Sequence, residues 1–335
     1  MNIDERFELI KRNTQEIVKE DELKKLLKEK KNPVVYWGTA VTGKPSLAYL
    51  FPLLKLKDFI DAGFKVKILL ADLHGALDGT SWEVLEKRYD FYKEAITQIL
   101  KVVGTDIKKI EFVKGSEFQL KPEYMYDVLQ LASKNSINDC QRASAEVVKQ
   151  SDNPNLAGLI YPIMQALDEH YLEVDVQFGG IDQRKILMFA RENLPKITYS
   201  QRIDVFNPMI PGLVGKKMSS SDAKSKIDLT DDEKSVKEKV NKADCVAGDP
   251  DNGVMAFLKY VIMVLKGDNN EKFVIERPDK YGGNLEYETY DAIEKDFVAK
   301  KLHPLDLKNA VAKDITDLLS KVDIKKLDGL GKKAY

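Results

Sequence analysis

The sequence predicts an α/β protein with a doubly wound parallel sheet, followed by a mostly α-helical region. Short apolar runs alternate with longer stretches of helical periodicity over the first part of the chain, which is typical of parallel strands joined by crossover helices. From about residue 230 onward the periodicity is helical and strand signals are few. The 335 residues have roughly the length of two domains. We therefore expect one domain at residues 1–229 and a second at residues 230–335.

The expected elements alternate in a regular order. Roughly the first thirty residues are charged and have a helical pattern. Strands are expected at the short apolar runs 34–37, 66–73, 109–113 and 174–178. Helices are expected at residues 46–62, which Gly63 would end, and at 82–102. Residues 122–171 are wholly helical in pattern, so we expect a helical insertion at about 120–170 in the winding order of the sheet.

Composition excludes several classes of protein. Lys and Arg number 53 against 54 Asp and Glu, a net charge of −1, which excludes a uniformly basic nucleic-acid binder but not a local basic patch. Two cysteines and three histidines argue against a disulfide scaffold and against a metal site. Neither a signal peptide nor an apolar run of membrane-spanning length is visible. We expect a cytoplasmic protein with no membrane segment.

A glycine-containing loop follows the first expected strand. Residues 38–44 read GTAVTGK, which is most of the P-loop pattern GxxxxGK in its usual place between a strand and a helix. Backbone amides at the start of a helix attract phosphate, so nucleotide binding is expected. However, Pro45 stands where a P-loop has its magnesium-binding Ser or Thr, and Ser46 comes one position late. On spacing alone, residues 38–44 could belong either to a P-loop enzyme or to a plain structural turn.

A second motif, KKMSSS at residues 216–221, is by itself only a polar loop. Together with the first loop, it resembles the paired HIGH and KMSKS signatures of class I aminoacyl-tRNA synthetases. Further strings are YWGT at 36–39, ADLH at 71–74, YPIMQALD at 161–168 and GGIDQRK at 179–185. These strings are similar to the tyrosyl-tRNA synthetases of archaea and of the eukaryotic cytosol. The resemblance covers residues from about 30 to 325.

This resemblance implies a class I catalytic domain at 1–229 and a helical anticodon-binding domain at 230–335. It implies that ATP activates L-tyrosine to tyrosyl-adenylate, and that tyrosine then passes to the 3′-terminal adenosine of tRNA(Tyr). Mg²⁺ would accompany ATP, and neither a tightly bound cofactor nor a protein-held metal is expected. The helical block at about 120–150 resembles the part through which the family forms homodimers.

A polar stripe on one expected helix suits an amino-acid substrate. Tyr161, Gln165 and Asp168 are spaced i, i+4 and i+7 and share one helix face. A surface helix would also have such a stripe, but a phenol, an amide and a carboxylate match a small zwitterion with a phenolic tail. By the resemblance, Asp168 and Tyr36 contact the substrate phenol. Tyrosine binding then involves Tyr36, Tyr161, Gln165, Asp168 and Gln183. His74 would end the strand at 66–73, near the substrate, although a lone histidine is more often structural.

In the reaction that the resemblance implies, the attacking group is the tyrosine carboxylate, which is already ionised. Positioning and charge stabilisation could then carry the first step without a side-chain base. The resemblance assigns catalytic roles to Thr42, Lys44, Ser46, Lys217 and Ser220. It assigns ATP binding to Gly38, Thr39, Thr42, Gly43, Ser46, Tyr49, Gly180, Asp182, Lys217, Met218 and Ser219. Lys217 would neutralise the charge that develops on diphosphate, and Asp182 would contact the ribose.

One position departs from the family pattern. Aligned on Gly43 and Lys44, the HIGH tetrapeptide reads SLAY at residues 46–49, so Ser46 stands where the first histidine is normally kept. Loss of one donor to the transition state lowers a rate by about 10²–10³-fold, and the serine hydroxyl can recover part of this. The chain is therefore either an active enzyme that tolerates serine or a paralogue that binds ligand and tRNA without efficient catalysis. The other site positions match the pattern, which favours activity.

Two further alternatives stay open. A tryptophan-specific relative would share the fold, but Asp168 and Tyr36 are suited to a phenol. A P-loop NTPase would share the glycine loop, but Pro45 removes the hydroxyl that such an enzyme places on magnesium.

The resemblance implies that the chain recognises tRNA. Because the chain has almost no net charge, we expect individual side-chain contacts, and not a uniformly basic surface, to hold the tRNA. The string RPDKYGG at 277–283 resembles the loop whose aromatic residue, here Tyr281, stacks on the first anticodon base. The string HPLDLKN at 303–309 resembles the helix start whose carboxylate, here Asp306, bonds that base. Without the resemblance, Asp306 would be read as a residue of the helix N-terminus. The residues expected to meet the acceptor stem are Arg142, Arg184 and Lys185.

Overall fold

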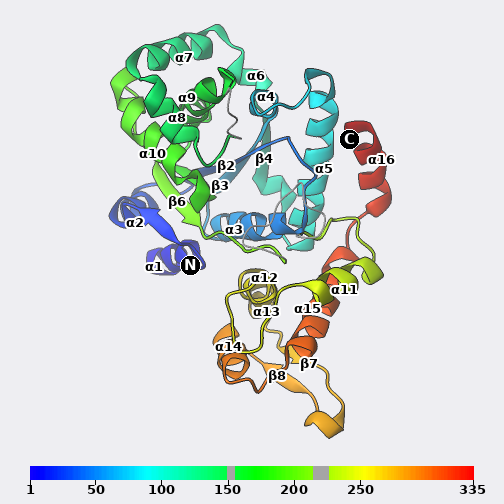
Figure 1. Cartoon of the computed structure of the whole chain (residues 1–335). Coiled ribbons are helices and arrows are strands. Elements are labelled where there is room, and N and C mark those ends of the chain that lie inside the picture. The colour runs from blue at the N-terminus through cyan, green and yellow to red at the C-terminus, as the bar shows by residue number, and fades with distance from the viewer. Residues whose placement is uncertain (149–154, 214–225) are drawn as a thin grey trace.

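A computed structural model describes residues 1–148, 155–213 and 226–335 (Figure 1). Within these described residues, the main sheet has six strands in the order β1-β6-β5-β2-β3-β4. The strands are β1 (Glu16–Val18), β2 (Val34–Ala40), β3 (Lys65–Ala71), β4 (Ile110–Lys114), β5 (Val176–Gly180) and β6 (Ile203–Asn207). All neighbours pair in parallel except β1, which runs antiparallel to β6. The prediction of a doubly wound parallel sheet is confirmed.

The winding order creates a switch point beside β2. From β2 the chain adds β3 and then β4 on one side, and it later returns to add β5 and β6 on the other side. Helices that follow β2 and β5 therefore leave the sheet in opposite directions. In open α/β sheets the crevice at this point, outside the carboxyl ends of the strands, is where ligands bind.

Helices cover both faces of the sheet. One face carries α3 (Leu50–Asp61) and α5 (Leu85–Val102), and the short α4 (Asp72–Leu77) follows β3. The expected helical insertion lies between β4 and β5, and its described helices are α6 (Ser116–Gln119), α7 (Pro122–Lys134), α8 (Ile137–Ser144) and α9 (Ala157–Tyr171). After β5 comes α10 (Arg184–Asn193). Side chains of β2 alternate between the two faces, because Val35 and Trp37 join the core under α3 while Tyr36 faces the other way.

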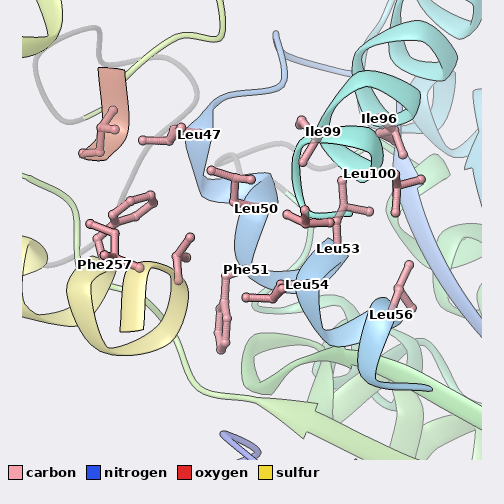
Figure 2. Packing of buried hydrophobic residues seen from close by; sticks show 14 of the residues in the cluster. Leu47, Leu50, Phe51, Leu53, Leu54, Leu56, Ile96, Ile99, Leu100 and Phe257 are labelled. Carbon is pink, nitrogen blue, oxygen red and sulfur yellow. The ribbon is translucent and has the colours of Figure 1, made fainter. Parts of the chain in front are cut away.

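The core under α3 continues into the C-terminal part of the chain. Leu53 of α3 lies near Ile99 and Leu100 of α5 (Figure 2). On another side of the same helix, Phe51 faces the C-terminal helices, and its ring centroid is 5.0 Å from that of Tyr260. Buried residues from the sheet, from α3 and from the C-terminal helices form one hydrophobic cluster.

The C-terminal part is mainly helical, as predicted. Its helices are α11 (Glu233–Lys242), α12 (Gly253–Phe257), a π-helical turn (Leu258–Ile262), α13 (Met263–Asp268), α14 (Tyr290–Val298), α15 (Pro304–Leu319) and α16 (Ile324–Ala334). The last of these, α16, returns to the sheet domain and lies along α5 (Figure 1). Its first turn is fixed there, since the Asp323 amide donates to Gln98 Oε1 at 2.6 Å. The domain division at residues 229 and 230 stays a prediction.

Several short strands differ from the sequence-based expectation. The N-terminal region was expected to be helical throughout, but it contains β1 between α1 (Ile3–Lys11) and α2 (Glu20–Glu29). Strand β6 and the hairpin of β7 (Phe273–Ile275) and β8 (Leu285–Tyr287) were also not expected. The prediction that His74 ends a strand is wrong, because β3 stops at Ala71 and His74 lies in α4. None of the described helices has the length and apolar character that crossing a bilayer requires.

Candidate active site

A pocket of about 320 Å³ opens at the switch point, between the carboxyl ends of β2 and β5. It brings together most of the described residues that the sequence predicts for tyrosine and ATP. These are Tyr36, Gly38, Thr39, Thr42, Tyr49, Tyr161, Gln165, Asp168, Gly180, Asp182 and Gln183. They come from β2, the loop after it, α9 and the turn after β5.

Helix α9 presents its polar stripe to the pocket. Tyr161, Gln165 and Asp168 all line the cavity, while Ile163 and Leu167 are buried against α7 and α10 on the other side of the helix. The spacing of polar and apolar residues therefore orients the helix, because only one rotation about its axis buries the apolar face.

The two carboxylate oxygens of Asp168 have different surroundings. Oδ1 accepts hydrogen bonds from Gln119 Nε2 and from the Tyr124 hydroxyl, both at 2.8 Å. Oδ2 is buried and has no hydrogen-bond partner, and the nearest basic atom is His74 Nε2 at 3.9 Å. Burial raises the pKa of Asp168 to about 7, against the lowering effect of the two hydrogen bonds. A buried acceptor without a partner is costly, so a donor on a ligand would be bound strongly here.

The groups around Asp168 are neutral. Burial, together with the nearby Asp168 and other anionic groups, raises the pKa of the Tyr36 hydroxyl well above its ordinary value. Burial also raises the pKa of Tyr161. His74, whose ring meets the Tyr161 ring edge-on at 4.6 Å, has its pKa lowered by burial to about 4. The floor of the pocket is therefore made of two phenols, a neutral imidazole and one carboxyl group.

The turn after β5 forms the adjoining wall. Gln183 ends a 3₁₀ turn (Ile181–Gln183) and accepts a hydrogen bond from Gln165 Nε2 at 3.3 Å. A side chain at Gly180 would collide with Asp182, since a Cβ there would lie 2.5 Å from Asp182 Oδ1. Glycine at this position therefore lets the Asp182 side chain stay close to the backbone.

Residues 38–44, here called the phosphate loop, lie at the other end of the pocket. The Thr39 hydroxyl is 3.0 Å from the hydroxyl of Tyr49, and Thr42 lines the cavity. Of the described residues predicted for catalysis or ATP binding, three lie outside the lining: Gly43, Lys44 and Ser46. Lys44 faces a neighbouring cavity of about 490 Å³ together with Tyr335. Ser46 is buried and forms an antiparallel bridge with Asp228.

The predicted residues of the second signature, Lys217, Met218, Ser219 and Ser220, lie outside the described residues. Among those that are described, no group of three or more His, Cys, Asp or Glu side chains is arranged to hold a metal ion.

Sequence reasoning missed the two residues that hold Asp168. Gln119 ends α6, soon after β4, and Tyr124 belongs to the first turns of α7. A polar residue that follows a strand at the carboxyl edge of the sheet was the available signal for Gln119. Nothing in the spacing of Tyr124 indicates its contact with α9.

A second groove, of about 490 Å³, lies between α8 and α10 and contains all three residues predicted for the acceptor stem, Arg142, Arg184 and Lys185. Each of them is paired with an acid. Arg184 binds Glu16 at 2.7 Å, Lys185 binds Glu146 at 2.7 Å, and Arg142 pairs with Asp139. In the C-terminal part, Tyr281 is exposed in a turn before Gly282, and Asp306 lies in the first turn of α15.

The sheet, its helical insertion and the pocket at the switch point define a class I aminoacyl-tRNA synthetase catalytic fold. Residues 28–320 match the family of class I tRNA synthetases for tryptophan and tyrosine, and the chain belongs to that family. It is similar to the crystal structure of tyrosyl-tRNA synthetase from Archaeoglobus fulgidus complexed with L-tyrosine. The TM-score is 0.90 and the identity 39%, over 97% of this chain and 99% of that chain.

The chain is also similar in sequence to tyrosine–tRNA ligases of a eukaryote and an archaeon. The chain is 48% identical to the cytoplasmic tyrosine–tRNA ligase of Gallus gallus, over 95% of this chain and 60% of that protein. It is 44% identical to the tyrosine–tRNA ligase of Natronomonas pharaonis, over 96% of this chain and 94% of that protein. The chain thus spans 60% of the length of the Gallus gallus relative and nearly all of the archaeal one.

Proposed function

We propose that this chain activates L-tyrosine with ATP, forming tyrosyl-adenylate and diphosphate, and transfers the tyrosyl group to the 3′-terminal adenosine of tRNA(Tyr). The unpartnered Oδ2 of Asp168, buried at the end of the pocket next to Tyr36, carries this proposal. A phenolic hydroxyl entering there supplies the missing donor. Phenylalanine would leave the oxygen unpaired, and rejection by roughly 10⁵-fold is the value known for tyrosine-specific enzymes of this class.

The remaining pocket residues suit the other parts of the two substrates. Tyr161, Gln165 and Gln183 can hold the α-ammonium group, and Asp182 can bind the ribose. Thr39 and Thr42 would meet the phosphates, with Lys217 from the second signature neutralising the leaving diphosphate. The tyrosine carboxylate attacks the α-phosphorus, the bond to diphosphate breaks, and no side-chain base is needed. Mg²⁺ would arrive with ATP as its counterion.

Tyrosine-dependent ATP–diphosphate exchange tests this function. We expect exchange with L-tyrosine but not with L-tryptophan or L-phenylalanine, and we expect Asp168→Asn to raise the KM for tyrosine strongly. Asp127→Asn is a matched control, because Asp127 is also buried and accepts two tyrosine hydroxyls, from Tyr171 and Tyr199, but lies outside the pocket. Exchange that depends on tryptophan, or on no amino acid, would refute the proposal.

The groove between α8 and α10 supports the proposed contact with the acceptor stem, because Arg142, Arg184 and Lys185 converge there from two helices. Binding of phosphates by such residues depends on salt. Replacing all three with alanine should weaken tRNA(Tyr) binding in a filter-binding assay while leaving tyrosine-dependent exchange intact.

Helix α7 supports the proposed homodimer. Tyr126 and Leu129 on this helix are 65% and 67% exposed, and the nearby Leu120 and Ile137 are exposed to a similar degree. Exposed apolar patches of this kind mark interaction surfaces, and a second copy of this chain is the expected partner. Sedimentation of the wild type and of Leu129→Glu would measure the association. The cytoplasm is the expected compartment, because the similar tyrosine–tRNA ligase of Gallus gallus is a cytoplasmic one.

A further inference from the structure

Helix α5 binds the carbonyl groups of the phosphate loop. Arg88 Nη1 donates to the carbonyl oxygen of Thr42 and, at 3.4 Å, to that of Val41. Tyr92, one helical turn further along, donates its hydroxyl to the carbonyl oxygen of Gly43. Three consecutive carbonyl groups of the loop are therefore held toward α5.

This arrangement determines the direction of the following amides. The carbonyl and the next N–H of a trans peptide point in opposite directions, so the amides of Gly43 and Lys44 point away from α5. Neither amide finds an acceptor among the described residues. Successive backbone amides that are fixed and unpaired favour the binding of phosphate oxygens.

Arg88 is itself held by the end of α16. Its Nε donates to the Ala334 carbonyl at 3.3 Å, and its guanidinium lies 4.5 Å from the centre of the Tyr335 ring. The Tyr335 ring also meets Phe91 of α5 edge-on at 5.6 Å. Arg88 Nη1 also donates a hydrogen bond to the Thr80 hydroxyl oxygen at 3.1 Å. A guanidinium has several donors in one plane, which lets this residue join α16 to the phosphate loop.

We propose that Arg88, oriented by Ala334 and Tyr335 of the C-terminal part, is a positioning residue that sets the phosphate loop for ATP. The residue does not line the pocket and acts through the loop carbonyls. The inference rests on the proposed function, and it adds that α16 contributes to the nucleotide end of the site. Displacing α16 from α5 should therefore weaken ATP binding and leave tyrosine binding unchanged.

Exchange kinetics with ATP and tyrosine varied separately test this role. Arg88→Ala should raise the KM for ATP by about tenfold or more, because charge-assisted hydrogen bonds to the loop are lost, with the KM for tyrosine within about twofold of wild type. The KM for ATP of Arg88→Lys should lie between those of the wild type and Arg88→Ala, since lysine keeps the charge but not the fork of donors. Tyr335→Ala should raise the KM for ATP by about threefold. Tyr335→Phe keeps the ring over the guanidinium, so its KM for ATP should stay closer to that of the wild type than the KM of Tyr335→Ala does.

Lys326→Ala is the matched control. It removes an ion pair between α16 and Glu94 of α5 at 2.6 Å but touches neither Arg88 nor the loop, so its KM for ATP should stay within about twofold of wild type. An unchanged KM for ATP in Arg88→Ala overturns this inference, as does an equal rise in both KM values. Tyrosine-dependent exchange by the wild type would still support the proposed function in those cases. If Arg88→Ala does not fold, the comparison of Tyr335→Ala with Tyr335→Phe decides the question.

Discussion

The two carboxylate oxygens of Asp168 would have separate roles in the proposed site. Its Oδ1 is bound by Gln119 and Tyr124 within the protein, and its Oδ2 has no hydrogen-bond partner among the described residues. Because both internal donors bind the same oxygen, the carboxyl group cannot rotate without losing two hydrogen bonds. The free oxygen is therefore fixed in direction before substrate arrives, which reduces the ordering cost of binding.

Tyrosine binding should improve as the pH rises from about 6 to about 8. The pKa of Asp168 is about 7, and its carboxylate is a stronger acceptor for a phenol than its protonated form. His74 has a pKa of about 4 and stays neutral over this range. The KM for tyrosine in exchange assays should fall with an apparent pKa near 7. A flat profile in the wild type would contradict this, and Asp168→Asn should lack the dependence.

The raised pKa of Asp168 affects folding stability in the opposite direction: stability falls as the pH rises, whereas tyrosine binding improves. The folded-state pKa of Asp168 lies above its ordinary value of 3.8, so the folded protein binds the proton more tightly than the unfolded chain does. The stabilising contribution is full below about pH 4 and is lost as the pH rises through about 7. The carboxyl group of Asp204, whose pKa burial also raises to about 7, adds to this trend.

Substitutions of Ser46 test whether the absence of the family's histidine at this position affects catalysis. Although Ser46 is buried outside the pocket lining, we expect Ser46→His to raise the rate of tyrosine activation and Ser46→Ala to lower it. Histidine would restore, and alanine would remove, a hydrogen-bond donor at the position where the family pattern has histidine. ATP–diphosphate exchange by the three proteins measures the effect. Rates that do not differ among them would show that this position does not contribute to catalysis.

Helical spacing was enough to predict that Tyr161, Gln165 and Asp168 share one helix face, and all three line the pocket. The partners of Asp168 could not be predicted in this way. Gln119 and Tyr124 are 49 and 44 residues away in sequence, and they reach it only because α6 and α7 pack across α9. Such contacts depend on tertiary packing, which local periodicity does not encode.

At the scale of elements, the prediction of strands followed apolar runs and not burial. Strand β4 was predicted although none of its residues is buried, and β6 was missed although all five of its residues are buried, because two of them, Asp204 and Asn207, are polar. The central strands β2, β3 and β5 appear as apolar runs, because parallel strands are covered on both faces. Strand β1 and the strands of the β7–β8 hairpin have three residues each. A three-residue strand is too short to show an alternation, so its pairing partner decides whether it forms.

An ion-pair network joins α1, α3 and α13, and it should contribute strongly to stability. Arg12 pairs with the buried Asp58 and, at 2.6 Å, with Asp268. Arg12→Ala would leave the Asp58 carboxylate with only Lys55, so we expect a loss of about 2–4 kcal/mol in the free energy of unfolding, measured by urea denaturation. Lys25→Ala breaks an exposed pair with Glu29 and should cost less than about 1 kcal/mol. Equal losses would show that burial of Asp58 does not matter.

At the scale of the whole molecule, we expect the sheet domain to activate tyrosine and the C-terminal part to contribute to tRNA recognition. Asp306 lies in the C-terminal part, away from the pocket lining. We expect Asp306→Ala to impair tyrosylation of tRNA(Tyr) but to spare tyrosine-dependent diphosphate exchange, since exchange needs no anticodon contact. Aminoacylation and exchange assays on the same preparation measure both activities. Equal losses in the two assays would contradict this division.

The hydrophobic cluster that runs from the sheet through α3 into the C-terminal helices has a thermodynamic consequence. Phe51 and Phe257 belong to the same buried cluster as Val35 and Leu319, so neither part can open without exposing apolar surface of the other. Local unfolding of one part alone is then penalised. Calorimetry should therefore record a single cooperative heat-absorption peak, and amide hydrogens in α3 and α12 should exchange with solvent at similar rates.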